Sequence, residues 1–399
     1  MDKNLERFIR YVKIDTQSND KSNLTPSEPK ELNLTRLLQQ ELKDLGIDST
    51  INEFGILYAK LDGEKDLDPI GLNSHVDTAL ELSGKDVKPQ IIQKYGGGVI
   101  KLNTNYSMSP EEFPSLQRHI GDDLVVTSGD TLLGADDKAG IAIIMAAVAY
   151  FVQHKEIKHH PICICFTPDE EIGRGPDHFD AKEFGAKYAY TIDGGIYNEI
   201  AIETFNAAHA VITIDGVSIH PGEAKGKLVN SQYIAFEFNS LLPNNLRPEL
   251  TEGREGFNHL VSIEGNVNRT ILSYILRNHD RDKLLQQKEC FLNVAKLLQE
   301  KYPTANIQVE LGDDYRNMKE VFDIHPEAIQ KAERAFKALG ITPQFNPIRG
   351  GTDGATFSFK GCPTPNLGTG SYNHHGRYEY LSVNEFNKMI EIVIEILKK

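Results

Sequence analysis

The segment "CICFTPDEEIGRG" (163–175) joins an apolar run to a cluster of acids. β-Branched and other apolar side chains fill positions 161–167, which predicts a buried β-strand. The chain then continues directly into Asp169, Glu170 and Glu171. Three adjacent carboxylates repel one another, and burying them unpaired would cost several kcal/mol each. The segment therefore predicts a core strand whose carboxyl end carries a site for a cation or for proton transfer.

Three other short segments, 56–61, 69–75 and 188–192, are apolar on both faces, as expected for strands of a buried parallel sheet. Between them, residues 138–154 form a long apolar segment suited to a helix that crosses from one parallel strand to the next. These patterns predict an α/β domain in which a mixed, mostly parallel sheet is flanked by helices.

The hydrophobic pattern changes after residue 205. The stretches "HAVITIDGVSI" and "RTILSYILRNHD" alternate apolar and polar residues, which is typical of a sheet with one solvated face. Helical patterns follow at 231–242 and 281–301, and a further strand-like segment lies at 306–311. We therefore predict an inserted α+β domain.

The last part of the chain returns to the hydrophobic pattern of the first part, with helical segments predicted near 326–339 and 383–398. A length of 399 residues also exceeds what one core usually serves. The predicted organisation is a catalytic domain in two parts, 1–205 and 316–399, interrupted by an insert at 206–315.

Composition narrows the possible partners. A net charge of −14 argues against a nucleic-acid partner, because nucleic acid requires a basic surface. No apolar run reaches the length of a bilayer span, and the N-terminal stretch has the pattern of an amphipathic helix rather than of a signal peptide. Of the four cysteines, Cys163 and Cys165 lie two apart on one strand face, and no Cys-x-x-Cys spacing is present. We expect reduced thiols and a cytoplasmic protein without a membrane partner.

Polar residues gather where the predicted strands end. They are His75 and Asp77 in "NSHVD", Asp136 and Asp137 in "GADDK", Glu170 and Glu171 in "TPDEE", Asp193 in "TIDGG", and His374 and His375 in "NHHG". The carboxyl ends of parallel strands share one edge of a sheet, where ligands bind. Histidine and carboxylate together suit zinc, cobalt or manganese.

Each of these pieces also has an ordinary explanation. Asp136 and Asp137 could cap a helix, the "DGG" sequence could be a tight turn, and the paired histidines could lie on the surface. Their recurrence after one predicted strand after another favours a metal site. We interpret Asp169 as a surface or loop carboxylate. The residues alone do not choose between His374 and His375.

The stretches "NSHVDT", "TLLGADDKAGIA", "FTPDEEIG", "TIDGG", "RGGTDGA" and "NHHG" together resemble the motifs of a zinc metallopeptidase family. The family includes aminoacylase, carnosinase, succinyl-diaminopimelate desuccinylase and tripeptide aminopeptidases, and the tripeptide aminopeptidases are the most similar. The resemblance extends from Asn73 to Gly376. It implies a zinc exopeptidase-like domain with an inserted ferredoxin-like lid.

The resemblance also implies roles for these residues. His75 and Asp193 would bind one zinc ion, Glu171 and His375 a second, and Asp136 would bridge both, with Co²⁺ or Mn²⁺ as possible substitutes. Asp137 would not be a ligand. Glu170 would be the general base, and Asp77 would hold the imidazole of His75.

Substrate contacts follow from the same resemblance. Arg349, with Gly350 and Gly351, would lie near the carboxylate and backbone of the substrate, and Arg277 is a weaker candidate. In several relatives a lid histidine, here His220, reaches the active site of a partner subunit, which implies a possible homodimer through the lid.

The predicted function is hydrolysis of the N-terminal residue from tripeptides, with small peptides as the binding partners. One alternative is a dipeptidase or an N-acyl-amino-acid deacylase of the same family. Another is a catalytically silent protein that binds metal or peptide. Glu170 argues against a silent protein, because binding requires the ligands but not a free base.

Overall fold

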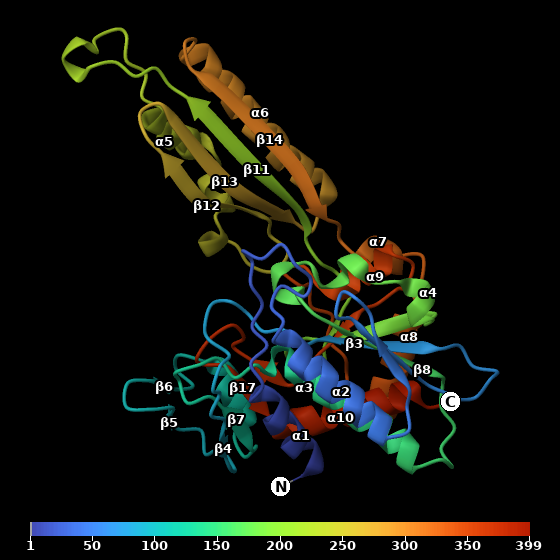
Figure 1. The fold of residues 1–399 in the computed structure, drawn as a ribbon. Coiled ribbons are helices and arrows are strands. Elements are labelled where there is room, and N and C mark those ends of the chain that lie inside the picture. The colour runs from blue at the N-terminus through green and yellow to red at the C-terminus, as the bar shows by residue number, and fades with distance from the viewer. Residues whose placement is uncertain (1) are drawn as a thin grey trace. The chain divides into compact units, whose positions relative to one another are not determined.

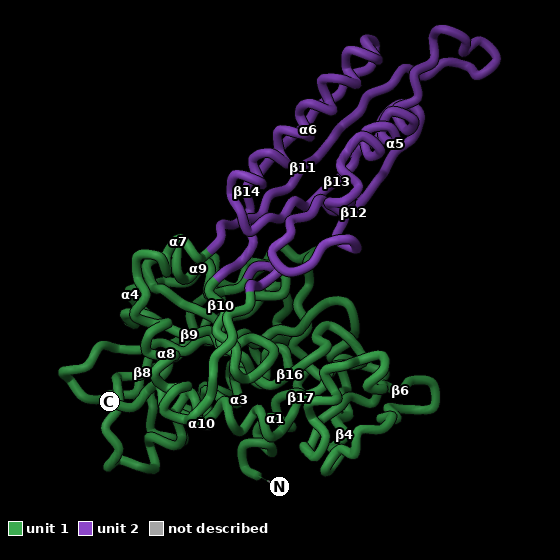
Figure 2. Tube along the Cα trace, turned by 180° about the vertical axis from the view of Figure 1, so that it is seen from behind, with its two compact units in different colours: residues 1–202, 318–346, 352–399 green, residues 203–317, 347–351 purple. Residues whose placement is uncertain are grey.

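The computed structural model describes residues 2–399, which form two compact units (Figure 2). The second unit comprises Glu203–Asn317 and Pro347–Gly351, and the first unit comprises the rest. The expected insert, 206–315, lies within the second unit. Residues 347–351, which the sequence analysis placed with the catalytic domain, cluster with the second unit instead.

A mixed sheet forms the centre of the first unit (Figure 1). Its order is β1 (Ser49–Ile51), β2 (Leu57–Leu61), β8 (Ile162–Thr167), β3 (Ile70–His75), β9 (Tyr188–Ile192), β15 (Asn366–Leu367) and β10 (Ile200–Ala201). The neighbours β8, β3, β9 and β15 run parallel, whereas the outer strands are antiparallel. The predicted mixed sheet is confirmed.

Helices cover both faces of this sheet. One face packs against α1 (Lys3–Val12), α2 (Glu31–Asp44), α3 (Ala135–Gln153), α8 (Glu327–Ala338) and α10 (Val383–Leu397). The other face packs against the short helices α4 (Ala181–Phe184) and α9 (Asp353–Phe359). Every residue of β3, β8 and β9 is buried, which explains why these strands are apolar on both faces.

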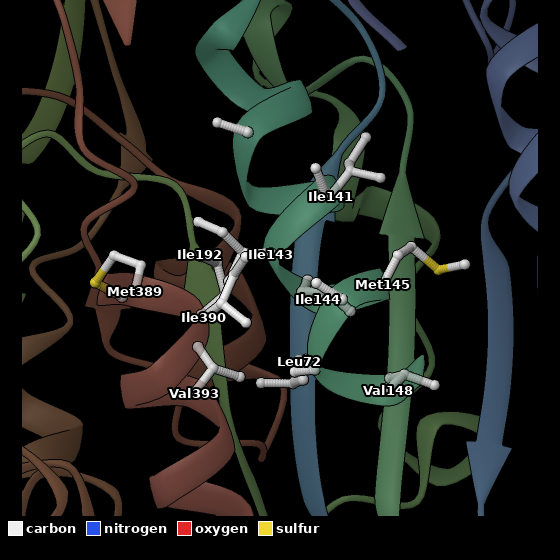
Figure 3. Packing of buried hydrophobic residues seen from close by; sticks show 14 of the residues in the cluster. Leu72, Ile141, Ile143, Ile144, Met145, Val148, Ile192, Met389, Ile390 and Val393 are labelled. Carbon is white, nitrogen blue, oxygen red and sulfur yellow. The ribbon is translucent and has the colours of Figure 1, made fainter. Parts of the chain in front are cut away.

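Helix α3 lies at the centre of the larger core. Figure 3 shows its isoleucines packed with Leu72 and Ile192 from the sheet and with Ile390 and Val393 from α10. Gly140 permits this close approach, because a Cβ atom there would lie 1.8 Å from the backbone oxygen of Ile192. The approach places the first turn of α3 beside the carboxyl ends of β3 and β9.

Smaller elements were not predicted from the sequence. A second sheet has the order β16 (Ser371–Tyr372), β17 (Tyr380–Ser382), β7 (Leu124–Val126) and β4 (Gln90–Ile92). A hairpin pairs β5 (Ile100–Lys101) with β6 (Ser107–Met108), and α7 spans Lys319–Phe322. The turn between β16 and β17 carries His374 and His375.

The second unit is a ferredoxin-like βαββαβ fold (Figure 1). Its elements are β11 (Asn206–Asp215), α5 (Ser231–Leu241), β12 (Phe257–Gly265), β13 (Arg269–Asn278), α6 (Arg281–Lys301) and β14 (Asn306–Tyr315). The strands are antiparallel in the order β12-β13-β11-β14. Strand β12 was not predicted from the sequence.

The two helices of this unit lie on the same face of its sheet (Figure 2). Along β13, Leu272, Tyr274 and Leu276 are buried against them, while Ile271 and the other alternate residues are more exposed. The predicted alternation between a buried and a solvated face is therefore present. Among residues 2–399, no helix combines the length and apolar character needed to cross a membrane.

Candidate metal centre

Three parallel strands bring three of the five predicted ligands, His75, Glu171 and Asp193, to one edge of the sheet. His75 is the last residue of β3, and its backbone is in register with Thr167, the last residue of β8. Strand β8 leads into a 3₁₀ turn at Glu170–Ile172, and Asp193 follows the end of β9 directly. Parallel strands with matched ends bring these side chains together.

Asp136 lies between two histidines. Its Oδ1 is 3.0 Å from Nε2 of His75, and its Oδ2 is 3.3 Å from Nε2 of His375. The His75 side chain is only 2% exposed, whereas that of His375 is 43% exposed. One carboxylate therefore faces two imidazoles, one deep in the core and one accessible from solvent.

Two further carboxylates complete the cluster, one beside each histidine. Asp193 Oδ1 lies 3.8 Å from His75 Nε2, and Glu171 Oε2 lies 3.1 Å from His375 Nε2. Ligand atoms of His75, Asp136 and Glu171 all fall within 4.8 Å of one another. The structure thus brings together all five residues predicted as ligands.

The electrostatics of the cluster favour bound cations. Burial, reinforced by Asp136, raises the pKa of Glu171 to about 7 and that of Asp193 well above its ordinary value. Glu171 Oε1 is buried without a hydrogen-bond partner. Within residues 2–399, these carboxylates form ion pairs only with histidines. Histidine with carboxylate is a donor set that fits zinc, so the residues present suit a divalent ion.

Asp77 and Glu170 lie beside the cluster. The carboxylate of Asp77 accepts the backbone N–H groups of Glu170 at 3.0 Å and Glu171 at 3.1 Å. Its Oδ1 also lies 3.3 Å from Nδ1 of His75. Burial, together with the charge of Asp193, raises the pKa of Glu170 well above its ordinary value. Asp77 thereby connects the predicted base, the ligand next to it and the buried histidine.

Asp137 occupies a different position. Its ligand atoms also fall within 4.8 Å of those of His75 and Asp193. Its Oδ1 accepts the N–H of Gly140 at 3.2 Å, and its Oδ2 accepts the N–H of His75 at 3.3 Å. Both oxygens of Asp137 therefore accept backbone N–H groups, and its exclusion from the ligands stays a prediction.

His374 lies close to the cluster without facing it as His375 does. Its Nε2 is 2.8 Å from Ser371 Oγ, and its Nδ1 is 3.6 Å from Asp136 Oδ2. His375 is closer to Asp136 and also contacts Glu171. Geometry thus favours His375 over His374 as the ligand.

Asp169 lies in the loop that follows β8, which is one of its two expected positions, but it is fully buried, so the surface alternative was wrong. Its two carboxylate oxygens accept the N–H of Ser27, at 3.0 and 2.8 Å. Its own N–H donates to Glu31 Oε2 at 3.2 Å. These partners lie more than 130 residues earlier in the chain, so no local pattern shows that the carboxylate is enclosed.

Sequence reasoning also missed Asp353. This buried carboxylate accepts a 2.5 Å hydrogen bond from Thr167 Oγ1, while its Oδ1 has no hydrogen-bond partner. Burial raises its pKa to about 7, and its charge contributes to the raised pKa of Glu170. The stretch "RGGTDGA" contained the signal, but only its arginine and glycines were considered.

The residues predicted to contact substrate all lie in the second unit. His220 is exposed, and its Nδ1 accepts the N–H of Gly222. Arg277 donates to two backbone carbonyls and lies 3.4 Å from Asp314. Gly350 has open space around its Cα, and a Cβ at Gly351 would lie 3.2 Å from the ring of Tyr315.

Arg349 is held by neutral groups. It donates to the backbone oxygens of Gly253 and Glu255 and to Thr251 Oγ1, at 2.8–2.9 Å. Its guanidinium also lies over the rings of Phe205 and Phe257. Since no carboxylate of the described residues pairs with it, its charge remains available to an anionic group.

Comparisons with known sequences identify the family of the chain. The model of peptidase family M20/M25/M40 matches residues 132–399. Peptidase T of Clostridium perfringens is 50% identical over 396 residues, which cover 98% of each chain. Peptidase T of a Geobacillus species is 49% identical over 399 residues, covering 99% of this chain and 97% of the relative.

Solved structures show the same fold. Aminopeptidase PepT of Bacillus cereus superposes with a TM-score of 0.77 at 23% identity, and a tripeptidase of Staphylococcus aureus with a TM-score of 0.79 at 20% identity. Each comparison covers 99% of this chain and 97% of the other. A dinuclear metal-binding peptidase of the M20 family from Bacillus subtilis has a TM-score of 0.67 at 14% identity. That comparison covers 99% of this chain and 96% of the other.

Proposed function

The chain belongs to peptidase family M20/M25/M40 and is a peptidase, and from this premise we propose that it releases the N-terminal residue of tripeptides at a dinuclear metal centre. One observation carries the proposal: the two oxygens of Asp136 face His75 and His375 separately. A carboxylate in this position is suited to bridge two ions.

The proposed ligand sets follow the distances. His75 and Asp193 would hold one ion, Glu171 and His375 would hold the other, and Asp136 would serve both. We propose Zn²⁺ at both positions, with Co²⁺ or Mn²⁺ as substitutes, because the donors are imidazole and carboxylate. When bound, such ions lower the pKa of a coordinated water and polarise the scissile carbonyl.

Glu170 performs the proton transfer in this proposal. It removes a proton from the attacking water and delivers it to the leaving amine, because an amide nitrogen leaves poorly without a proton. Asp77 accepts the N–H of Glu170, and its Oδ1 lies 3.3 Å from Nδ1 of His75, so we propose that it keeps the base and this ligand in a fixed relative position.

The C-terminal carboxylate of the peptide is proposed to bind Arg349, with Gly350 and Gly351 giving room for the substrate backbone. Arg349 carries a charge that no described carboxylate neutralises, whereas Arg277 faces Asp314 and is the second candidate. A guanidinium suits bidentate binding of a carboxylate. His220 is proposed to donate a hydrogen bond to the developing oxyanion.

Peptide hydrolysis by the metal-reconstituted protein tests this function. We expect turnover of tripeptides in preference to dipeptides and tetrapeptides, and little turnover of an N-acetylated tripeptide. Amidation of the C-terminus should lower kcat/KM, since a charge-assisted contact contributes about 1.5–3 kcal/mol. Preferred turnover of the N-acetylated substrate would identify a deacylase, preferred turnover of dipeptides a dipeptidase, and metal binding without turnover a silent binding protein.

We also propose a homodimer formed through the second unit, in the cytoplasm. Strand β12 lies at the edge of its sheet, and an edge strand readily pairs with a second copy. The proposal of a cytoplasmic location rests on the sequence, which has few cysteines and no Cys-x-x-Cys spacing. Light scattering of the purified protein tests the oligomeric state, and a monomer at micromolar concentration would contradict it.

A further inference from the structure

Glu379 is a buried carboxylate that no step of the proposed reaction uses. It lies just before β17, is 1% exposed, and accepts three backbone N–H groups from a segment about 245 residues earlier in the chain. Oε2 accepts from Leu133 at 2.7 Å and from Gly134 at 2.8 Å, and Oε1 accepts from Asp136 at 3.0 Å.

These three N–H groups belong to the turn that leads into α3 and carries Asp136. Gly134 has a φ of +77°, so the chain turns sharply there, and no helical carbonyl is available to the N–H groups that follow. Charge-assisted hydrogen bonds to a carboxylate are stronger than those between neutral groups. Glu379 therefore fixes the path of the backbone immediately before the Asp136 side chain.

Two other carboxylates of the centre act in the same manner. Asp77 accepts the N–H groups of Glu170 and Glu171, and Asp137 accepts that of His75. Glu379 acts in the same way on Asp136, because it accepts the backbone N–H of this proposed ligand. The backbone N–H groups of four residues of the centre are thus held by acids that are not themselves proposed as ligands.

We propose that Glu379 is a positioning residue that aims the Asp136 carboxylate at both metal positions and thereby sets the affinity for both ions. The inference rests on the proposed function in one respect, namely that Asp136 binds both metal ions. Ligand distances at zinc tolerate deviations of only about 0.2 Å. The two Asp136 contacts, at 3.0 and 3.3 Å, depend on one backbone position, so a shift of the turn would disturb both together.

Titration of the metal-free protein with Co²⁺, followed by visible absorption and calorimetry, measures this effect. The variant Glu379→Gln replaces one acceptor oxygen with an amide that faces N–H donors. We expect the dissociation constants of both Co²⁺ ions to rise by about 10- to 100-fold, as is usual when a group supporting a ligand is lost. The Co²⁺ spectrum of the variant should also change, because Asp136 is misdirected.

Ser382→Ala is the matched control. Ser382 lies three residues further on, is equally buried, and bonds to Asp122 and to the N–H of Glu385 at the start of α10. Ser382→Ala removes these two hydrogen bonds from the same region but none of the hydrogen bonds to the turn before α3. We expect its Co²⁺ affinities to match those of the wild type.

Wild-type Co²⁺ affinities in a folded Glu379→Gln variant would overturn the proposal. If that variant does not fold, Glu379→Asp keeps the charge with a shorter reach and should show intermediate affinities. Failure of both variants to fold would make Glu379 a purely structural residue and would also overturn the proposal. A wild type that binds two Co²⁺ ions but cleaves no tripeptide would refute the proposed function alone, since the affinity comparison does not depend on turnover.

Discussion

Glu31 and Asp169 fasten the N-terminal part of the first unit to the loop that carries the proposed base. Both carboxylates are buried, and Glu31 accepts the N–H of Asp169 while its other oxygen accepts from Ser27 and Glu28. Burial, with the charges of Asp77 and Asp169, raises the pKa of Glu31 from 4.5 to about 9. Protonation of Glu31 therefore removes its electrostatic repulsion with Asp77 and with Asp169.

Stability should depend on pH through this residue. Between pH 4.5 and about pH 9 the folded protein binds a proton that the unfolded chain has released, so the free energy of unfolding falls as pH rises. The slope is at most about 1.4 kcal/mol per pH unit. Glu31→Gln cannot ionise and should flatten the thermal unfolding profile of the metal-free protein from about pH 6 to about pH 9.

Glu28→Gln provides the control for this prediction, because Glu28 lies three residues earlier and is only half-buried. It should keep the pH profile of the wild type. If Glu31→Gln loses stability with rising pH as steeply as the wild type, then Glu31 is not the group that releases the proton.

At the level of elements, helix α3 sets the geometry of the centre. Its first turn carries Asp136, and Gly140 in its second turn lies against β9 and β3. A Cβ at position 140 would lie 1.8 Å from the oxygen of Ile192 and 2.5 Å from Ser74 Oγ and Asp137 Oδ1. No side-chain rotation relieves a clash with backbone, so α3 would have to move away from the sheet.

Gly140→Ala should therefore destabilise the protein by several kcal/mol and reduce metal binding at the same time. Thermal unfolding and metal content of the purified variant measure the two effects. Gly98→Ala is the control, because Gly98 has no atom within 4 Å of an added Cβ. A Gly140→Ala variant with the stability and metal content of the wild type would show that α3 can shift without cost.

The strongly patterned elements could be predicted from the sequence. Strands β3, β8 and β9 are largely apolar because both of their faces are buried, and His75, Glu171 and Asp193 lie at or just after their ends. Short strands such as β16 and β17 have too few residues for a pattern. The enclosure of Asp169 and the role of Glu379 depend on partners 142 and 243–246 residues away, which spacing along the chain does not show.

For the molecule as a whole, the residues of the proposed reaction are divided between the two units. The five proposed ligands and Glu170 lie in the first unit, whereas His220, Arg277 and Arg349 lie in the second. His220 is exposed on a turn and has no core partner, so it is available to a substrate held in the same subunit or in another. Loss of a hydrogen-bond donor to the oxyanion costs about 2.7–4 kcal/mol, so His220→Ala should lower kcat by about a hundredfold or more.

Mixing two inactive variants determines which subunit supplies His220. In a dimer where His220 acts across the interface, combining His220→Ala with Glu170→Ala under subunit exchange should restore active sites, because one site of each mixed dimer receives both groups. Labelled subunits confirm the exchange. If exchange occurs and no activity returns, His220 acts within its own subunit or has no catalytic role.

The most direct test separates the two adjacent glutamates by the metal that each variant retains. Elemental analysis of zinc-reconstituted Glu170→Gln should find both ions still bound, while tripeptide hydrolysis falls by about 10²- to 10⁴-fold. Glu171→Gln, measured alongside, should lose the ion that His375 shares and keep the one beside His75. Loss of zinc from Glu170→Gln, with both ions retained by Glu171→Gln, would contradict the assignment of base and ligand on which the proposed reaction depends.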